Sequence, residues 1–136
     1  MIVVPFIPLH LNFTPQAEQA EMYNLMPEYL DFYNNGDAYT GVVDGEVIGC
    51  AGFIPTPLGL MVWAMLSDKA RLHLKAITKS VLTEFRKRGE LVALVRDGFS
   101  EGIRWAGLLG FRDTGEVYEN TEGQNCKLFV RQNGSG

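Results

Sequence analysis

The sequence predicts a mixed α/β fold with a mostly antiparallel sheet and helices on both faces of the sheet. Two β-rich runs flank the turn residues Asp44 and Gly45, which predicts a hairpin near the middle of the chain. Farther on, the apolar period changes to steps of three and four, which predicts a long helix. That helix is marked by Leu74, Ile77, Val81 and Phe85.

Length and composition favour one soluble domain. The 136 residues suit a single hydrophobic core, which we expect over residues 1–132, with a flexible tail at 133–136. Hydrophobic residues make up 46% and charged residues 21%, as in ordinary globular proteins. The apolar start, residues 1–9, is short, contains two prolines and lacks a basic flank. It therefore predicts a strand and not a signal peptide or membrane span.

The thiols and imidazoles do not form a metal motif in the sequence. Cys50 and Cys126 are far apart and make no CxxC pair, while His10 and His73 are too distant for a local zinc motif. We expect two small buried thiols in the reducing cytoplasm, and no bound metal.

Charge is distributed unevenly along the chain. The net charge of −4 argues against a nucleic-acid binder that depends on bulk positive charge. All 12 Lys and Arg follow Asp68, whereas the 16 acidic residues divide evenly, so the halves carry 0 − 8 = −8 and 12 − 8 = +4. The asymmetry indicates two faces with different partners, unless folding interleaves the halves.

The first third of the chain predicts one strand followed by two helices. Residues 3–9 form the expected strand. Thr14 and Pro15 suit the start of a helix over 15–25, because a hydroxyl caps and proline fits the first helical position. Pro27 opens a second helix that ends near residue 34.

The middle of the chain predicts three strands. Residues 39–43 and 47–54 form the hairpin, because Asp and Gly tolerate the positive φ of its tight turn. Pro55 and Pro57 are expected to end the second strand, and residues 60–66 form the third.

The last part predicts a long helix, a strand, a short helix and two strands. The long helix spans 69–88 and stops at Gly89, and a buried strand covers 91–95. The short helix spans 100–109 and ends at Gly110. Residues 111–118 and 127–131 are expected to form an antiparallel pair.

This order of elements resembles the GNAT N-acetyltransferase superfamily. Three segments carry the resemblance: the hairpin at 43–52, the passage from Leu66 into the long helix, and residues 103–111, which end in Leu109, Gly110 and Phe111. A narrower resemblance is to GNAT-like proteins of short-tailed bacteriophages. Its positions are Trp63, Asp68, His73, the run Ile103, Arg104 and Trp105, and the pair Gly110 and Phe111.

The resemblance implies a site for acetyl-CoA as co-substrate at the start of the long helix. Members of the superfamily hold the CoA pyrophosphate on a Q/R-x-x-G-x-G/A loop, where backbone N–H groups and the helix dipole attract anions. The matching residues are Arg71, Leu72, His73, Leu74, Lys75 and Ala76. Leu74 replaces the middle glycine, although Lys69, Arg71 and Lys75 add positive charge. The alternative is an ordinary solvated helix face.

The resemblance also implies where acyl transfer takes place. Backbone N–H groups of Ala64, Met65 and Leu66 are expected to hold the acyl carbonyl. Many members use a tyrosine to protonate the departing thiolate, and Ala106 stands in its place here. Asp68 and His73 are the candidate bases, unless Asp68 caps the helix and His73 contacts phosphate. Ser67 and Tyr118 are further candidates for the base.

Two functions of different kinds follow. The first is an N-acetyltransferase, phage-encoded, that acts on an amine of a host protein or on a small amine, and that forms a homodimer. Acidic residues of the first half would steer a cationic acceptor, or would serve only solubility. They are Glu18, Glu21, Glu28, Asp31 and Asp37. The second is a non-catalytic protein of the same fold that binds a host or virion protein. A third reading is a nucleotide- or polyphosphate-binding module.

Overall fold

The computed structural model describes residues 1–14, 37–119 and 123–132. The helices expected over 15–25 and 27–34 lie outside the described residues, as does the tail at 133–136. Coverage of both faces of the sheet by helices depends on those two segments, so that part of the predicted fold stays a prediction. Among the described helices, none is long and apolar enough to cross a membrane.

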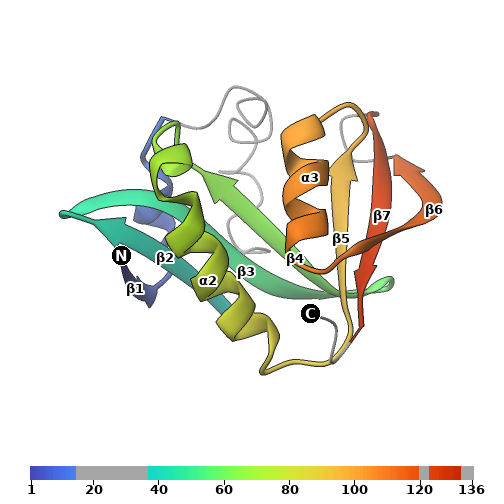
Figure 1. Ribbon diagram of the computed structural model, residues 1–136, viewed down its shortest axis with the longest axis horizontal. Helices are drawn as coiled ribbons and strands as arrows, with labels where there is room; N and C mark the ends of the chain where they lie inside the picture. The colour runs from blue at the N-terminus through green and yellow to red at the C-terminus, as the bar shows by residue number, and fades with distance from the viewer. Residues whose placement is uncertain (15–36, 120–122, 133–136) are drawn as a thin grey trace. The chain divides into compact units, whose positions relative to one another are not determined.

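Seven strands form one mixed sheet in the order β1-β2-β3-β4-β5-β7-β6 (Figure 1). The pairs β1/β2, β2/β3, β5/β7 and β6/β7 are antiparallel, and β4/β5 is parallel. The predicted class, a mostly antiparallel mixed sheet with helices, is therefore confirmed. The strands are β1 (Ile2–Pro5), β2 (Asp37–Val43), β3 (Glu46–Thr56), β4 (Gly59–Leu66), β5 (Leu91–Arg96), β6 (Arg112–Glu119) and β7 (Asn125–Arg131).

The chain divides into two compact units. The first comprises Met1–Pro55 and Val62–Val81, and the second Thr56–Met61 and Leu82–Gly136. Strand β4 contributes to both, and its register with β5 in the described residues consists of the pair Met61 and Val92.

The central hairpin forms as the sequence predicts. Val43 pairs with Glu46, so Asp44 and Gly45 make a two-residue turn, with φ of 51° and 77°. Positive φ at both positions is the requirement of a type I′ turn, which Asp-Gly meets at little cost. The expectation that Pro55 helps to end the second strand was wrong, because β3 continues through Pro55 to Thr56.

The first strand is shorter than expected. β1 ends at Pro5, and a 3₁₀ helix, η1 (Pro8–Leu11), begins within the predicted range 3–9. The N–H of His10 donates to the carbonyl of Ile7 over 2.9 Å, and the N–H of Ile7 donates to His10 Nδ1 over 3.2 Å. These bonds close a turn that competes with extended backbone, so the apolar residue Leu9 lies in a helix.

The long helix is split and shorter than the predicted range 69–88. A 3₁₀ turn, η3 (Ala70–His73), precedes α2 (Leu74–Phe85). Beyond Phe85 the chain tightens, because the N–H of Arg88 donates to the carbonyl of Phe85 over 3.1 Å. The helix therefore ends at Phe85, before the stop expected at Gly89, and Gly89 is not among the described residues with positive φ.

In the second unit, β7 lies between β5 and β6, and α3 (Ser100–Leu108) packs against β5 (Figure 1). The expected end of α3 is confirmed. Gly110 has φ of 92°, its N–H donates to the carbonyl of Gly107, and the N–H of Phe111 donates to the carbonyl of Ala106. This pair of bonds is a Schellman motif, which the Leu-Gly-Phe sequence favours.

A buried arginine completes that helix end. Arg131 on β7 is 2% exposed, and its Nε donates to the carbonyl of Leu109 over 3.0 Å. Its guanidinium lies 5.5 Å from the ring centroid of Phe85, which itself packs edge-on against Phe111. A cation beside the last carbonyls of α3 is favourable because that end of a helix is negative.

The core of the first unit contains a close backbone approach at Gly52. Phe6, Cys50 and Met65 form a buried cluster against which Trp63 packs. A Cβ atom at Gly52 would lie 2.7 Å from both the carbonyl oxygen of Asp37 and Nε1 of Trp63. Only glycine therefore fits between β2 and the Trp63 ring.

We predict that Gly52→Ala lowers the free energy of unfolding by about 1–3 kcal/mol, because backbone and indole must shift. Urea unfolding followed by Trp fluorescence measures it. Gly89→Ala is the control, since a Cβ there meets nothing within 4 Å. Equal stability of the two variants would contradict the packing described.

Candidate functional site

The passage from β4 to the helix start depends on Ser67, which is 3% exposed. Its N–H donates to the carbonyl of Ile48 on β3 over 2.9 Å, which keeps Ser67 attached to the sheet. Its Oγ accepts from the N–H of Lys69 over 3.2 Å, and its carbonyl accepts from the N–H of Ala70 over 3.1 Å. The hydroxyl thus bends the chain out of the strand, as serine does in local turns.

The next two residues are also held from outside the turn. The N–H of Asp68 donates to the carbonyl of Thr14 over 2.9 Å, and Lys69 Nζ lies 2.7 Å from Glu46 Oε1. That hydrogen bond and the Glu46 charge raise the pKa of Lys69, with Asp68 adding to the effect. Lys69 is thereby committed to Glu46, at the first position of β3.

Asp68 does not cap a helix. The N-cap of η3 is Lys69, without a side-chain capping bond, and Asp68 is exposed one residue earlier. The expectation that the long helix begins near Asp68 was wrong by about a turn and a half, because α2 begins at Leu74. The exposed carboxylate of Asp68 therefore keeps the alternative role of a base, which stays a prediction.

Cations gather at the positive end of α2. Arg71 and His73 lie in the last turn of η3, Lys75 is the second residue of α2, and the first turn of α2 has no acidic residue. Between Asp68 and Glu84 the sequence contains no carboxylate at all. Because the dipole makes this end positive, the cations do not stabilise the helix, whereas an anion bound here would interact favourably with both the cations and the dipole. The arrangement suits a phosphate group.

The hydrophobic side chains of this helix start divide between core and surface. Ala70 and Ile77 are buried at 0% and 7% exposure, whereas Leu72 is 81% exposed. Leu74, at the position of the expected glycine, is 37% exposed with φ of −59° and ψ of −36°. Since these angles are helical, the backbone at Leu74 does not require glycine.

The end of β4 is packed tightly against β3. Met65 and Leu66 are buried at 1% and 7% exposure, and Ala64 is half-buried. A Cβ at Gly49 would come within 2.8 Å of Leu66 Cδ2 and 3.3 Å of the Met65 carbonyl oxygen. Ala64, Met65 and Leu66 therefore belong to the same unit as Asp68, His73 and the cations of the helix start. Their role toward an acyl carbonyl stays a prediction.

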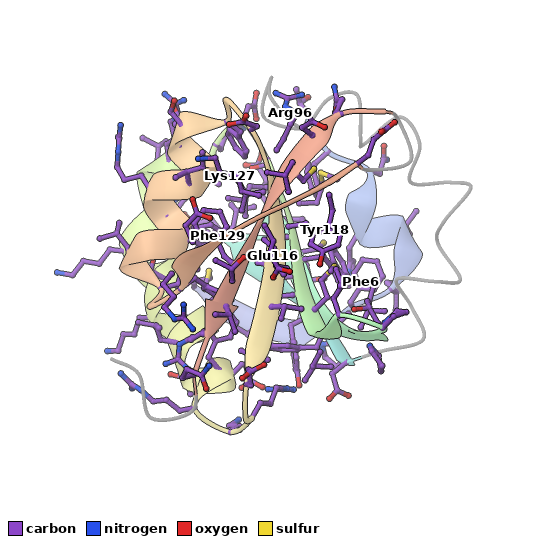
Figure 2. The ribbon with its side chains drawn as sticks, turned by 90° about the vertical axis from the view of Figure 1, so that its right-hand side faces the viewer. Phe6, Arg96, Glu116, Tyr118, Lys127 and Phe129 are labelled. Atoms are coloured by element: carbon purple, nitrogen blue, oxygen red, sulfur yellow. The ribbon has the colours of Figure 1, made fainter. Side chains whose placement is uncertain are left out.

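Ala106 and Tyr118 belong to the second unit. Ala106 is buried at 6% exposure, and its methyl group has no proton to give. Tyr118 on β6 donates its hydroxyl to Glu116 Oε1 over 3.3 Å, and Figure 2 shows the two side chains together. Partial burial and the Glu116 charge raise the pKa of Tyr118. The role of Tyr118 as a base stays a prediction.

A polar chain inside the first unit was not expected from the sequence. His10 Nδ1 lies 2.7 Å from Thr40 Oγ1, which lies 3.5 Å from Cys50 Sγ. Because the N–H of Ile7 also donates to Nδ1, that nitrogen accepts and the Thr40 hydroxyl donates. His10 and Thr40 are thirty residues apart, so no local pattern indicates their contact.

The thiol at the end of this chain is not a nucleophile. Burial raises the pKa of Cys50 to about 11, although the Thr40 hydroxyl acts in the opposite direction. Both cysteines are free and buried, as predicted. Within residues 1–14, 37–119 and 123–132, no three His, Cys, Asp or Glu side chains gather in a way that would hold a metal.

Comparison of the fold finds many acetyltransferases. Ard1 from Thermoplasma volcanium has a TM-score of 0.72 at 15% identity, with 97% of each chain covered. The F149A mutant of spermidine N-acetyltransferase SpeG from Vibrio cholerae has 0.63 at 12%, covering 97% of this chain and 95% of that one. Aminoglycoside 6'-acetyltransferase type Ii has 0.64 at 18%, with 97% of each covered.

The chain thus has the mixed sheet of the GNAT fold over nearly its whole length. No protein-family model matches the sequence, and no curated protein matches it. At these identities the likeness concerns the fold.

The pKa of Cys50 predicts a pH dependence of stability. Because the pKa of the Cys50 thiol is raised from 9.0 to about 11, the protonated thiol contributes fully to the stability of the fold below pH 9. That contribution is lost as the pH rises through about 11. The loss should be on the order of 1–3 kcal/mol. Urea unfolding of the protein and of Cys50→Ala between pH 8 and 11 (roughly the span of that titration) measures it. Parallel pH profiles would contradict the assignment, whereas a flatter profile for the variant supports it.

Proposed function

We propose that the protein is an acetyl-CoA-dependent N-acetyltransferase, and that one domain over residues 1–132 carries the activity. The observation that carries the proposal is the cationic start of α2, which follows β4 through the short helix η3, in a chain whose fold is that of acetyltransferases over nearly its whole length.

In this proposal the helix start binds the CoA phosphates. Arg71 and Lys75 supply charge-assisted hydrogen bonds, and the backbone of the turn supplies N–H donors at the positive end of the dipole. The residues assigned to the site are Arg71, Leu72, His73, Leu74, Lys75 and Ala76. Lys69 is not among them, because Glu46 neutralises it.

Acyl transfer then proceeds by attack of an amine on the thioester carbonyl. The C–N bond forms, the C–S bond breaks, and the CoA thiolate leaves. Backbone N–H groups at Ala64, Met65 and Leu66 would stabilise the oxyanion, and Asp68 or His73 would take the amine proton. Ala106 donates no proton, so the thiolate would be protonated by solvent or by the base after it has accepted the amine proton.

The source, location, oligomeric state and acceptor of the protein are proposed from the resemblance alone. We propose a phage-encoded protein that acts in the host cytoplasm, as a homodimer, on a host-protein amine or a small amine. The narrower resemblance to phage proteins rests on Trp63, Asp68, His73, Ile103, Arg104, Trp105, Gly110 and Phe111.

A second function is favoured by two observations, the methyl side chain at Ala106 and the leucine at position 74. Both depart from the pattern of active members, and both suit a protein that keeps the fold and binds a host or virion partner without catalysis.

The first prediction concerns donor binding. Calorimetric titration of the full chain with acetyl-CoA should give saturable binding and a raised melting temperature. Arg71→Ala and Lys75→Ala should each weaken the affinity about tenfold, the loss of one charge-assisted bond. Arg86→Ala, an exposed cation just after α2, is the control and should change it less than about twofold. Absence of binding at millimolar acetyl-CoA would overturn the proposal.

The second prediction concerns catalysis. With lysine peptides or polyamines as acceptors, the protein should release free CoA, which a thiol reagent detects. If Asp68 is the base, Asp68→Asn should lower kcat about a hundredfold with unchanged acetyl-CoA affinity; if His73 is the base, His73→Gln should lower kcat to the same extent. Binding without CoA release from any amine would favour the non-catalytic alternative.

A further inference from the structure

A segment of the first unit connects the end of β1 with the turn at Asp68. We call residues 7–14 the η1 segment, because η1 forms its middle. The carbonyl of Thr14, its last residue, accepts from the N–H of Asp68 over 2.9 Å. Asp68 is therefore held twice within the first unit, by the η1 segment and by its neighbour Ser67, whose N–H is bonded to β3.

His10 fixes the middle of the η1 segment. Its Nδ1 accepts from the Thr40 hydroxyl over 2.7 Å and from the N–H of Ile7 over 3.2 Å. Thr40 lies on β2 and is 0% exposed, so the imidazole ties the segment to the interior of the unit. The His10 ring also meets the Phe6 ring edge-on, with 6.4 Å between the centroids. One nitrogen thus satisfies both a buried hydroxyl and a backbone N–H.

Phe13 gives the η1 segment a second anchor of a different kind. It is half-buried and packs against the buried cluster of the first unit. Apolar packing of this kind is not directional, whereas hydrogen bonds specify both distance and angle. The orientation in which the segment arrives at Thr14 therefore depends on His10.

We infer that His10 is a positioning residue of the proposed active site, which acts through Thr14 on Asp68. This inference rests on the proposed function and takes Asp68 as its base. His10 holds the η1 segment, and the segment holds the N–H of Asp68. The carboxylate of Asp68 is thereby kept near the end of β4, two residues beyond Leu66. A base must lie within hydrogen-bond reach of the amine proton, so a displacement of about 1 Å lowers the rate.

Hydrogen exchange of the ¹⁵N-labelled full chain tests the link directly. His10→Ala should speed exchange of the Asp68 N–H about tenfold or more, because its acceptor is no longer held in place. The Ser67 N–H is the internal reference and should change less than about twofold. His10→Asn should restore slow exchange, since the asparagine Oδ1 stands where Nδ1 stood and accepts the same bonds.

The matched control is Thr114→Val. It removes the 2.8 Å bond from the Thr114 hydroxyl to the carbonyl of Leu128 in the second unit, and should leave exchange at Asp68 unchanged. If His10→Ala does not fold, Thr40→Val removes the same 2.7 Å bond and should speed exchange at Asp68 about threefold or more.

Steady-state kinetics separate positioning from folding. His10→Ala should lower kcat about tenfold while the affinity for acetyl-CoA stays within about twofold of the unaltered protein. His10→Asn should recover kcat, and Thr114→Val should retain it. A role of His10 in folding alone would lower kcat and donor binding together, in proportion to the folded fraction.

The contrary results are distinct from one another. Exchange at Asp68 that responds to neither His10→Ala nor Thr40→Val overturns the inference, as does equal acceleration at Ser67, which means general loosening of the unit. If Asp68→Asn leaves kcat unchanged, the inference falls while the proposed function stands on His73. An unaltered protein that neither binds acetyl-CoA nor releases CoA overturns the proposed function itself, and the role of His10 with it.

Discussion

The hydrogen bonds of Ser67 are the constraint on which the candidate site depends. A buried hydroxyl must have partners, and here it satisfies the N–H of Lys69 while the serine backbone bonds to Ile48 and Ala70. These three contacts decide where β4 stops and how η3 leaves the sheet. Without them, neither the cations of η3 nor the end of β4 would have a defined position within the first unit.

The electrostatics of the helix start follow from that geometry. Lys69 faces back toward the hairpin and is neutralised by Glu46, whereas Arg71, His73 and Lys75 follow at the positive end of α2. Cations at that end oppose the helix dipole, so they do not stabilise the helix. A phosphate offsets both, which is why the arrangement supports a donor site more than a solvated helix face.

Local chemistry made much of the fold predictable. Asp44 and Gly45 specify their turn through φ alone, and Gly110 with Phe111 specifies the end of α3 through two backbone bonds. Where tertiary contacts compete, prediction was less successful. The apolar period of Leu74, Ile77 and Val81 locates a helix but does not distinguish α from 3₁₀ geometry before it. The bond from Ile7 to His10 likewise turned a predicted strand end into a 3₁₀ helix.

The residues of the candidate site stand out in the sequence, but their contacts do not. Arg71 and Lys75 are visible from the sequence, while the contact of Lys69 with Glu46 joins positions 23 residues apart and follows only from the strand register. In the same way, the chain from His10 through Thr40 to Cys50 requires the pairing of β2 with β3. Long-range pairs of this kind have no local signature.

The central claim is that the start of α2 and the end of β4 form the donor site, and amide NMR tests it most directly. Titration of the ¹⁵N-labelled protein with acetyl-CoA should shift the amide signals of residues 70–76 and 64–66 first and most strongly. Saturable shifts confined to other parts of the chain, with these residues unchanged, would contradict the claim.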